Sequence, residues 1–253
     1  MKSFCFTVDD NIRFFKEITE NNFKSLFEHP YLNMYKCLHE KFNLKVQLNL
    51  FYRTNDFDLS SFSDRFYAEW QKNSHWLKLS FHSDSEKSNP YINSGYDEVF
   101  SDCKKTHAEI MRFASEKALA KTTTIHCCRT TKDGLNALKN NNISGLLGLW
   151  DNGENPRISY EVDADKIYNG EIVKKDGISF SKIDIILNMF PKEKILLQLE
   201  NLKNRDFIKI MIHEQYFYSD YKNYQPDFEI EISSAFSFLM ENGFESVFFE
   251  EMI

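Results

Sequence analysis

The most informative part of the sequence for the fold is Lys2-Ser3-Phe4-Cys5-Phe6-Thr7-Val8-Asp9-Asp10-Asn11. It begins as an apolar, aromatic and β-branched run, which is typical of a buried strand, and it ends abruptly at two adjacent carboxylates. The carboxyl end of such a strand is where α/β barrels and open α/β sheets bind ligands. The same residues also fit a strand with an Asx turn, in which Asp10 or Asn11 caps a helix from Ile12.

Strands and helices alternate along nearly the whole chain. Further strands are expected at residues 45–51, 76–81, 122–125, 146–150, 207–212 and 246–249. This alternation predicts a parallel sheet with helical crossovers, and some seven strands in 253 residues fit one closed or nearly closed barrel. We therefore expect a single domain over residues 1–253.

The alternation is interrupted after residue 150. Residues 157–175, with Asn169-Gly170 as the turn, have the pattern of a β-hairpin. Helices are expected at 182–189 and 192–202. The hairpin is therefore interpreted as an insertion on the barrel surface.

Composition excludes several classes of function. A net charge of −7 without a basic stripe argues against nucleic acid as a partner. There is no apolar stretch long enough to span a bilayer and no signal-peptide pattern, so we expect no membrane partner and a cytoplasmic location. The five cysteines lack paired metal-site spacing and are expected to be free thiols. None of these features determines the oligomeric state.

Ionisable residues follow the strands at the point where each strand ends. They are Asp9-Asp10, His82, His126, Asp151 and His213-Glu214. A parallel sheet brings such ends to one edge, where His, Asp and Glu from different strands can hold a zinc-like ion. Any single histidine could instead be a capping residue, but together they favour a site.

A stretch rich in aromatic residues, 216–224, follows His213-Glu214. Its rings could cover the site or stack on a sugar. They could equally pack down on the barrel rim, and the sequence leaves both interpretations open.

Three short motifs resemble those of the polysaccharide deacetylase family. Residues Phe6-Thr7-Val8-Asp9-Asp10-Asn11 look like its first motif, Ser80-Phe81-His82-Ser83 like its second and Ile210-Met211-Ile212-His213 like its last. The closing segment 227–249 also resembles the last helix and strand of that family, so the resemblance covers nearly the whole chain. It implies a distorted seven-stranded (β/α) barrel, here with the β-hairpin insertion, and a divalent metal used to remove N- or O-acetyl groups from sugars.

The resemblance also implies roles for single residues. Asp9 would be the general base and His213 the general acid, while Asp10 and His82 would bind the metal. Asp151 lies where the family has an aspartate that tunes the acid histidine.

Two departures from the family pattern concern the metal and the base. Glu86 stands where the family has a second histidine ligand, so Glu86, Asp84 or His126 is the candidate for the third ligand. His126-Cys127-Cys128-Arg129 replaces an Arg-x-Pro motif, and Arg129 could orient the base. Candidate substrate contacts at the same edge are Asn11, Glu214, Trp150 and Tyr216.

The sequence thus predicts a metal-dependent hydrolase, with zinc as the expected ion. Its substrate would be a small carbohydrate or an N-acylated molecule that loses an acyl group. One alternative is a catalytically inactive barrel that binds a carbohydrate or a protein partner. Another is a carboxylate-based glycosidase, in which Asp9 or Asp10 and Glu214 flank the bond.

Overall fold

The computed structural model describes residues 2–87, 90–150, 159–160, 162 and 164–253. The strands are β1 (Lys2–Asn11), β2 (Val46–Phe51), β3 (Leu77–Ser83), β4 (Thr122–Thr123), β5 (Gly145–Gly148), β6 (Val173–Lys175), β7 (Ile178–Lys182), β8 (Ile185–Ile186), β9 (Phe207–His213) and β10 (Phe244–Ser246). The α-helices are α1 (Arg13–Glu20), α2 (Pro30–Phe42), α3 (Tyr67–Asn73), α4 (Tyr96–Phe113), α5 (Lys132–Asn140), α6 (Ala164–Tyr168), α7 (Lys192–Leu202) and α8 (Phe228–Glu241). Within these residues no helix is both long and apolar enough to cross a membrane.

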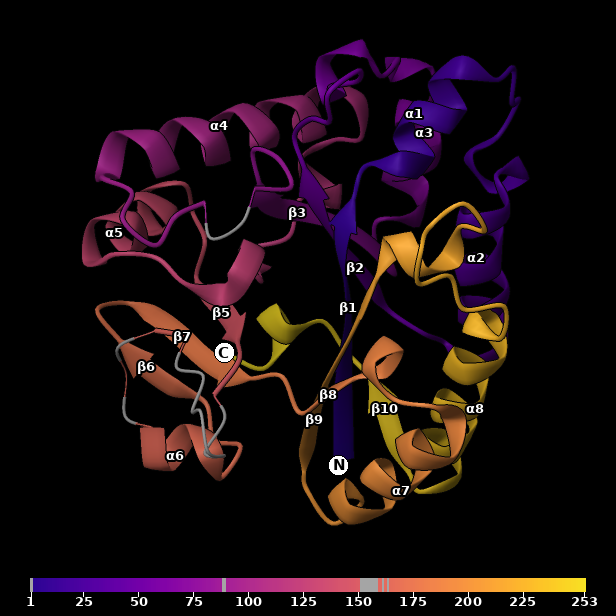
Figure 1. The fold of residues 1–253 in the computed structure, drawn as a ribbon, viewed down its shortest axis with the longest axis vertical. Helices are drawn as coiled ribbons and strands as arrows, with labels where there is room; N and C mark the ends of the chain where they lie inside the picture. The colour runs from indigo at the N-terminus through magenta and orange to yellow at the C-terminus, as the bar shows by residue number, and fades with distance from the viewer. Residues whose placement is uncertain (1, 88–89, 151–158, 161, 163) are drawn as a thin grey trace.

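Strand β1 is the centre of the larger sheet, which has the order β3-β2-β1-β9-β8 (Figure 1). It pairs with β9 over most of its length, from Ser3 opposite Phe207 to Asp9 opposite His213. Its other edge is shared, because β10 pairs with its start and β2 with its end. The smaller sheet has the order β4-β5-β7-β6, in which only the β6–β7 pairing is antiparallel.

The two sheets are joined on both sides. Between β7 and β8 the chain passes from one sheet to the other, where Ile183 N donates to Gly148 O and Asp184 N donates to Lys209 O. On the other side, a hydrogen bond from the Thr123 hydroxyl to the carbonyl of Phe81 links β4 to β3. With β7 and β8 taken as one interrupted strand, the parallel strands form the expected distorted (β/α) barrel.

The alternation of side chains along β1 sets what lies inside the barrel. Phe4 and Phe6 point outward and pack on Phe236 of α8, with ring centroids 5.4 and 4.9 Å apart. Cys5, between them, packs instead with residues of other strands in a separate cluster. Because successive side chains of a strand face opposite sides, Asp9 falls on the same inner face as Cys5.

Two local predictions were wrong. The described part of 157–175 contains helix α6, and the hairpin lies later, between β6 and β7, where Asp176 and Gly177 both have positive φ. Residues 182–189 are not an α-helix: they contain β8 and the 3₁₀ helix η6 (Leu187–Met189). Pairing of the buried Ile185 and Ile186 with β9 outweighs the local helical spacing.

Candidate metal centre

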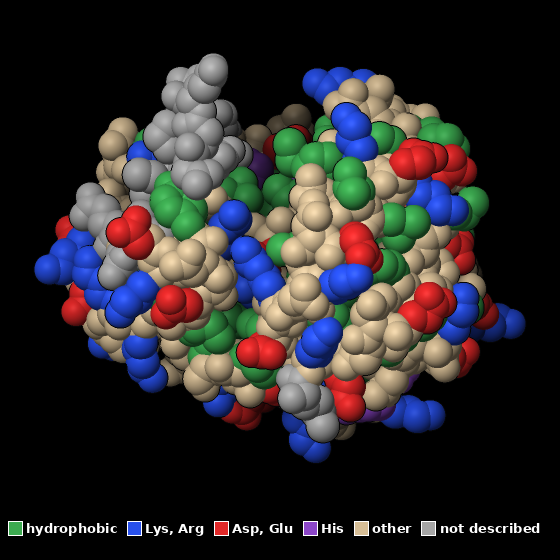
Figure 2. Space-filling model, turned by 90° about the horizontal axis from the view of Figure 1, so that it is seen from below, with side chains coloured by type: hydrophobic (Ala, Val, Ile, Leu, Met, Phe, Trp, Pro, Cys, Tyr) green, Lys and Arg blue, Asp and Glu red, His purple; other side chains and the backbone are tan. Residues whose placement is uncertain are grey.

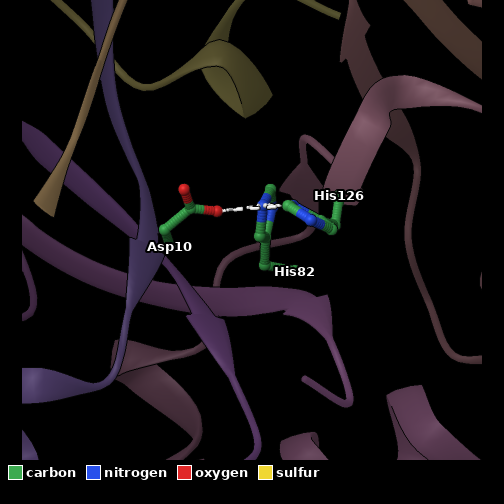
Figure 3. Close-up of side chains that lie close together, drawn as sticks. All are labelled: Asp10, His82 and His126. Atoms are coloured by element: carbon green, nitrogen blue, oxygen red, sulfur yellow. Dashed lines mark hydrogen bonds and ion pairs between the residues drawn. The ribbon is translucent and has the colours of Figure 1, made fainter. Parts of the chain in front are cut away.

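Asp10, His82 and His126 converge at the carboxyl ends of the strands (Figure 3). Asp10 belongs to β1 and His82 to β3, and His126 opens the 3₁₀ helix η5 (His126–Cys128) after β4. Asp10 Oδ1 lies 3.0 Å from His82 Nε2 and 3.4 Å from His126 Nδ1, and the two nitrogens are 3.2 Å apart. Of the candidates for the third ligand, the structure therefore brings His126 to the other two.

These distances fit a bound divalent ion. Four ligands around zinc at bond lengths of 2.0–2.1 Å lie about 3.3 Å from one another, close to the three edges measured here. The Nδ1–H of His82 donates to the carbonyl of Thr124, so Nε2 is the nitrogen that would bind an ion once it has released its proton. Phe51 packs on both imidazoles, with ring centroids 5.2 and 5.1 Å away. The three side chains thus form a preoriented set of donor atoms that could hold a metal ion.

The charges at the cluster are strongly coupled. Burial would raise the pKa of Asp10, but hydrogen bonds to His126 and His82 hold that pKa well below its usual value. Burial would lower the pKa of His82, but the carboxylates of Asp9 and Asp10 raise it. Asp10 is therefore ionised, and an ion entering the site competes with a proton on His82.

The other candidate ligands lie elsewhere. Glu86 is exposed and belongs to the wall of the groove described below, not to the cluster. Asp84 is held in ion pairs with Arg53 and Lys105, at 2.8 and 2.7 Å. The prediction of Glu86 as a metal ligand is thus not supported, because its side chain remains at the surface.

The turn after Asp9 is formed by Asp10 and Asn11. Asp10 itself, not Asn11, has the left-handed backbone, with φ of 65°. Asn11 is buried, and its Nδ2 donates to the carbonyls of Val8 (2.6 Å) and Asn49 (3.2 Å). Its amide holds the turn together and is not available to a substrate.

Asp9 is buried inside the barrel at the end of a chain of carboxamides. Its Oδ1 accepts a hydrogen bond from Asn49 Nδ2 at 2.7 Å, and Asn49 Oδ1 accepts from Gln47 Nε2 at 2.8 Å. Burial raises the pKa of Asp9, although His82 and His213 act to lower it. Arg129, which was predicted to orient Asp9, is exposed, and Asn49 contacts Asp9 instead.

His213 lies on β9 directly opposite Asp9 of β1. Asn188 Oδ1 accepts from the backbone N–H of His213 at 3.1 Å and lies 2.9 Å from its Nδ1. The hydrogen on Nδ1 is thereby fixed, and Nε2 is left for proton exchange. Asp151, which was predicted to tune this histidine, lies outside the described residues. The ring of Tyr216 lies beside the imidazole of His213, with ring centroids 6.1 Å apart.

Two predicted substrate contacts are buried and used for structure. Glu214 accepts hydrogen bonds from the backbone N–H groups of Ile12, Arg13 and Phe14, at 2.7, 2.9 and 2.9 Å. It therefore caps α1 from a distant part of the chain, so the expectation that Asp10 or Asn11 caps this helix was wrong. Trp150 is 1% exposed and packs on Tyr160 in a second core cluster.

A groove of about 760 Å³ opens beside the cluster. Asp10, Phe51, Arg53, Gln215 and Tyr221 are among the residues that line it. Of the aromatic stretch, Tyr221 borders the groove, whereas the rings of Phe217 and Tyr218 pack against the buried Tyr31. Packing on the barrel is thus confirmed for Phe217 and Tyr218, and covering the site or stacking on a sugar stays a prediction for Tyr221.

Three carboxamides that support the site were missed by sequence reasoning: Asn49, Asn188 and Gln215. Asn49 could have been found, because Gln47 and Asn49 alternate with apolar residues on one face of a strand. Asn188 and Gln215 carry no such signal, since both lie in 3₁₀ helices whose direction is set by the surrounding fold.

The sequence matches no family model and no curated protein. Among solved structures, the chain is similar to a family 4 acetyl xylan esterase from Clostridium thermocellum in complex with a cobalt ion. The TM-score is 0.56 at 15% sequence identity, and the match covers 99% of this chain and 90% of that chain. It is also similar to a CE4 family pseudoenzyme from Bacillus anthracis; TM-score 0.57, 9% identity, 99% and 64% covered. A third similar structure is the 4-α-glucanotransferase from Thermococcus litoralis; TM-score 0.61, 13% identity, 99% and 40% covered.

At these identities the likeness shows a shared fold. The resemblance to polysaccharide deacetylases expected from the motifs is thus confirmed for the fold. Because an esterase, a pseudoenzyme and a glucanotransferase all share it, the function of this chain has to be argued from its own site.

Proposed function

We propose that this protein is a metal-dependent hydrolase that removes an acyl group from a carbohydrate or an N-acylated small molecule. The observation that carries the proposal is the triangle of Asp10 Oδ1, His82 Nε2 and His126 Nδ1, with edges of 3.0 to 3.4 Å. These residues would hold zinc or another divalent ion. Such an ion supplies Lewis-acid activation of water and of the acyl carbonyl.

Asp9 and His213 supply the proton transfers in this proposal. Asp9 is adjacent to the ligand Asp10, and its raised pKa brings it closer to neutral pH, which suits a base that takes a proton from water. His213 lies opposite Asp9 on the neighbouring strand, and its Nε2 would protonate the departing amine or alkoxide. Asn49 and Asn188 hold the two groups in position.

The structure disfavours the carboxylate-based glycosidase. That mechanism requires Glu214 to reach the glycosidic bond, but Glu214 is 0% exposed and both of its oxygens accept backbone hydrogen bonds. The inactive binding barrel remains the competing function, and the likeness to a pseudoenzyme is compatible with it.

Metal titration separates these possibilities. Purified protein is titrated with zinc and cobalt chloride near neutral pH, and acetate release is measured on a panel of acetylated sugars and N-acetylated amines. Stoichiometric binding that is lost in Asp10→Ala, His82→Ala and His126→Ala but kept in the groove-wall variant Glu86→Ala supports the site. Metal-dependent acetate release then supports the hydrolase, binding without release favours the inactive barrel, and the absence of binding refutes the proposed site.

A further inference from the structure

Gln215 is in direct contact with the carboxylate of Asp10. Its Nε2 donates to Asp10 Oδ2 at 2.8 Å, whereas Asp10 Oδ1 faces the two imidazoles (Figure 3). The two oxygens of Asp10 therefore have different partners. Neither imidazole bonds Oδ2 in the described contacts.

The position of Gln215 is fixed by its neighbour. Both residues lie in the 3₁₀ helix η7 (Glu214–Phe217), which follows β9. Glu214 accepts hydrogen bonds from the backbone N–H groups of residues 12–14, which begin two residues after Asp10 in the chain. Two consecutive residues of η7 thus bind the segment around Asp10: Glu214 binds its backbone, and Gln215 binds the side chain of Asp10.

The orientation of the Gln215 amide is set by Asp10. An ionised carboxylate only accepts hydrogen bonds, so the amide must present its NH₂ group to it. Gln215 Oε1 is left buried, with no donor among the described residues. A buried carbonyl without a donor opposes folding. The contact of the Gln215 amide with Asp10 is therefore better explained by its effect on Asp10 than by a gain in the stability of the protein.

We propose that Gln215 is a positioning residue that occupies Oδ2 of Asp10 and leaves Oδ1 as the single oxygen offered to the ion. This inference rests on the proposed metal site. Partners of this kind orient ligands, and their loss weakens metal binding by about 10- to 100-fold. Without Gln215, Asp10 Oδ2 loses this donor, and only the contacts of Oδ1 with the two imidazoles restrict rotation of the carboxylate.

Gln215→Met tests the inference, with Gln225→Met as the matched control. Gln225 likewise donates one amide hydrogen bond, to the carbonyl of Asn188 at 3.0 Å, and likewise has a buried Oε1 without a described partner. Cobalt affinity is measured by absorption titration, and the stability of the metal-free proteins by urea unfolding. We expect about 10- to 100-fold weaker cobalt binding in Gln215→Met alone, with similar unfolding midpoints for the two variants.

The outcomes are distinguishable. Cobalt binding by Gln215→Met that equals wild type would overturn the inference and leave the proposed function standing. Equal weakening in both variants would also overturn it, because that result reports a general loosening of the loops. If the wild-type protein binds no cobalt, the proposed function and the inference fail together.

Discussion

Glu214 should make this protein less stable as the pH rises through the acidic range. Burial raises its pKa from 4.5 to about 7, against the backbone N–H groups of Ile12, Arg13 and Phe14, which lower it. The unfolded chain therefore releases this proton near pH 4.5, whereas the folded protein keeps it until about pH 7. Between these values the unfolded state binds fewer protons, so the free energy of unfolding falls with rising pH. A rise of about 2.5 pKa units corresponds to about 3 kcal/mol.

Glu214→Gln should remove this contribution, because the amide does not ionise. The amide resembles the protonated carboxyl group and stays neutral at every pH. As the pH rises from 4.5 to 8, the wild-type protein should therefore lose about 3 kcal/mol of unfolding free energy relative to the variant. Contributions from Asp9 and Asp10 are common to both proteins and cancel. Urea unfolding followed by tryptophan fluorescence measures the difference, because the indoles are all buried: Trp70, Trp76 and Trp150.

Glu86→Gln is the control for this experiment. Glu86 is exposed, so its replacement should leave the pH dependence of wild type unchanged. If the Glu214→Gln and wild-type stabilities ran parallel from pH 4.5 to pH 8, the inferred burial of an ionisable carboxyl group would be refuted.

Three further predictions follow from the site and the barrel interior. Because the pKa of His82 is raised, cobalt affinity should fall about tenfold per pH unit below that pKa, and a constant affinity from pH 8 to pH 5 would contradict a histidine ligand. Asn49→Leu should lower the free energy of unfolding by about 1.5–3 kcal/mol at pH 8, because it removes the donor to ionised Asp9, and by less at pH 4; equal losses in urea unfolding at both pH values would argue against this role. Lys209→Met should cost about 3–5 kcal/mol, since it leaves the buried carboxylate of Asp184 without the ammonium group 3.0 Å away; thermal unfolding that matches wild type would show that Arg205 alone suffices.

The opposite end of the barrel carries side chains of both charges. Figure 2 views the molecule from below, and acidic and basic side chains are interspersed over that face. The groove instead opens beside Asp10, at the carboxyl ends of the strands. This placement follows from the parallel strands, which deliver their terminal residues to one edge.

The sequence predicted most of what depends on the strands themselves. The apolar run of β1, the alternation of strands and helices, and the ionisable residues after each strand were sufficient to anticipate the barrel and the meeting of Asp10 with His82. Periodicity and strand ends are local properties, and a parallel sheet converts them directly into positions in space. Short segments between strands were less predictable, as the misplaced hairpin and the strand β8 show.

The side chains that support the site could be identified only from the three-dimensional fold. The sequence offered Glu86, Asp84 and His126 as equal candidates, and the fold brings His126 to within 3.4 Å of Asp10 while it leaves Glu86 at the surface. In the fold, Glu214, which was a candidate site residue, caps helix α1, and Gln215 contacts Asp10. A strand fixes the direction of its own side chains, but the partners of those side chains come from loops, whose paths depend on packing across the whole barrel.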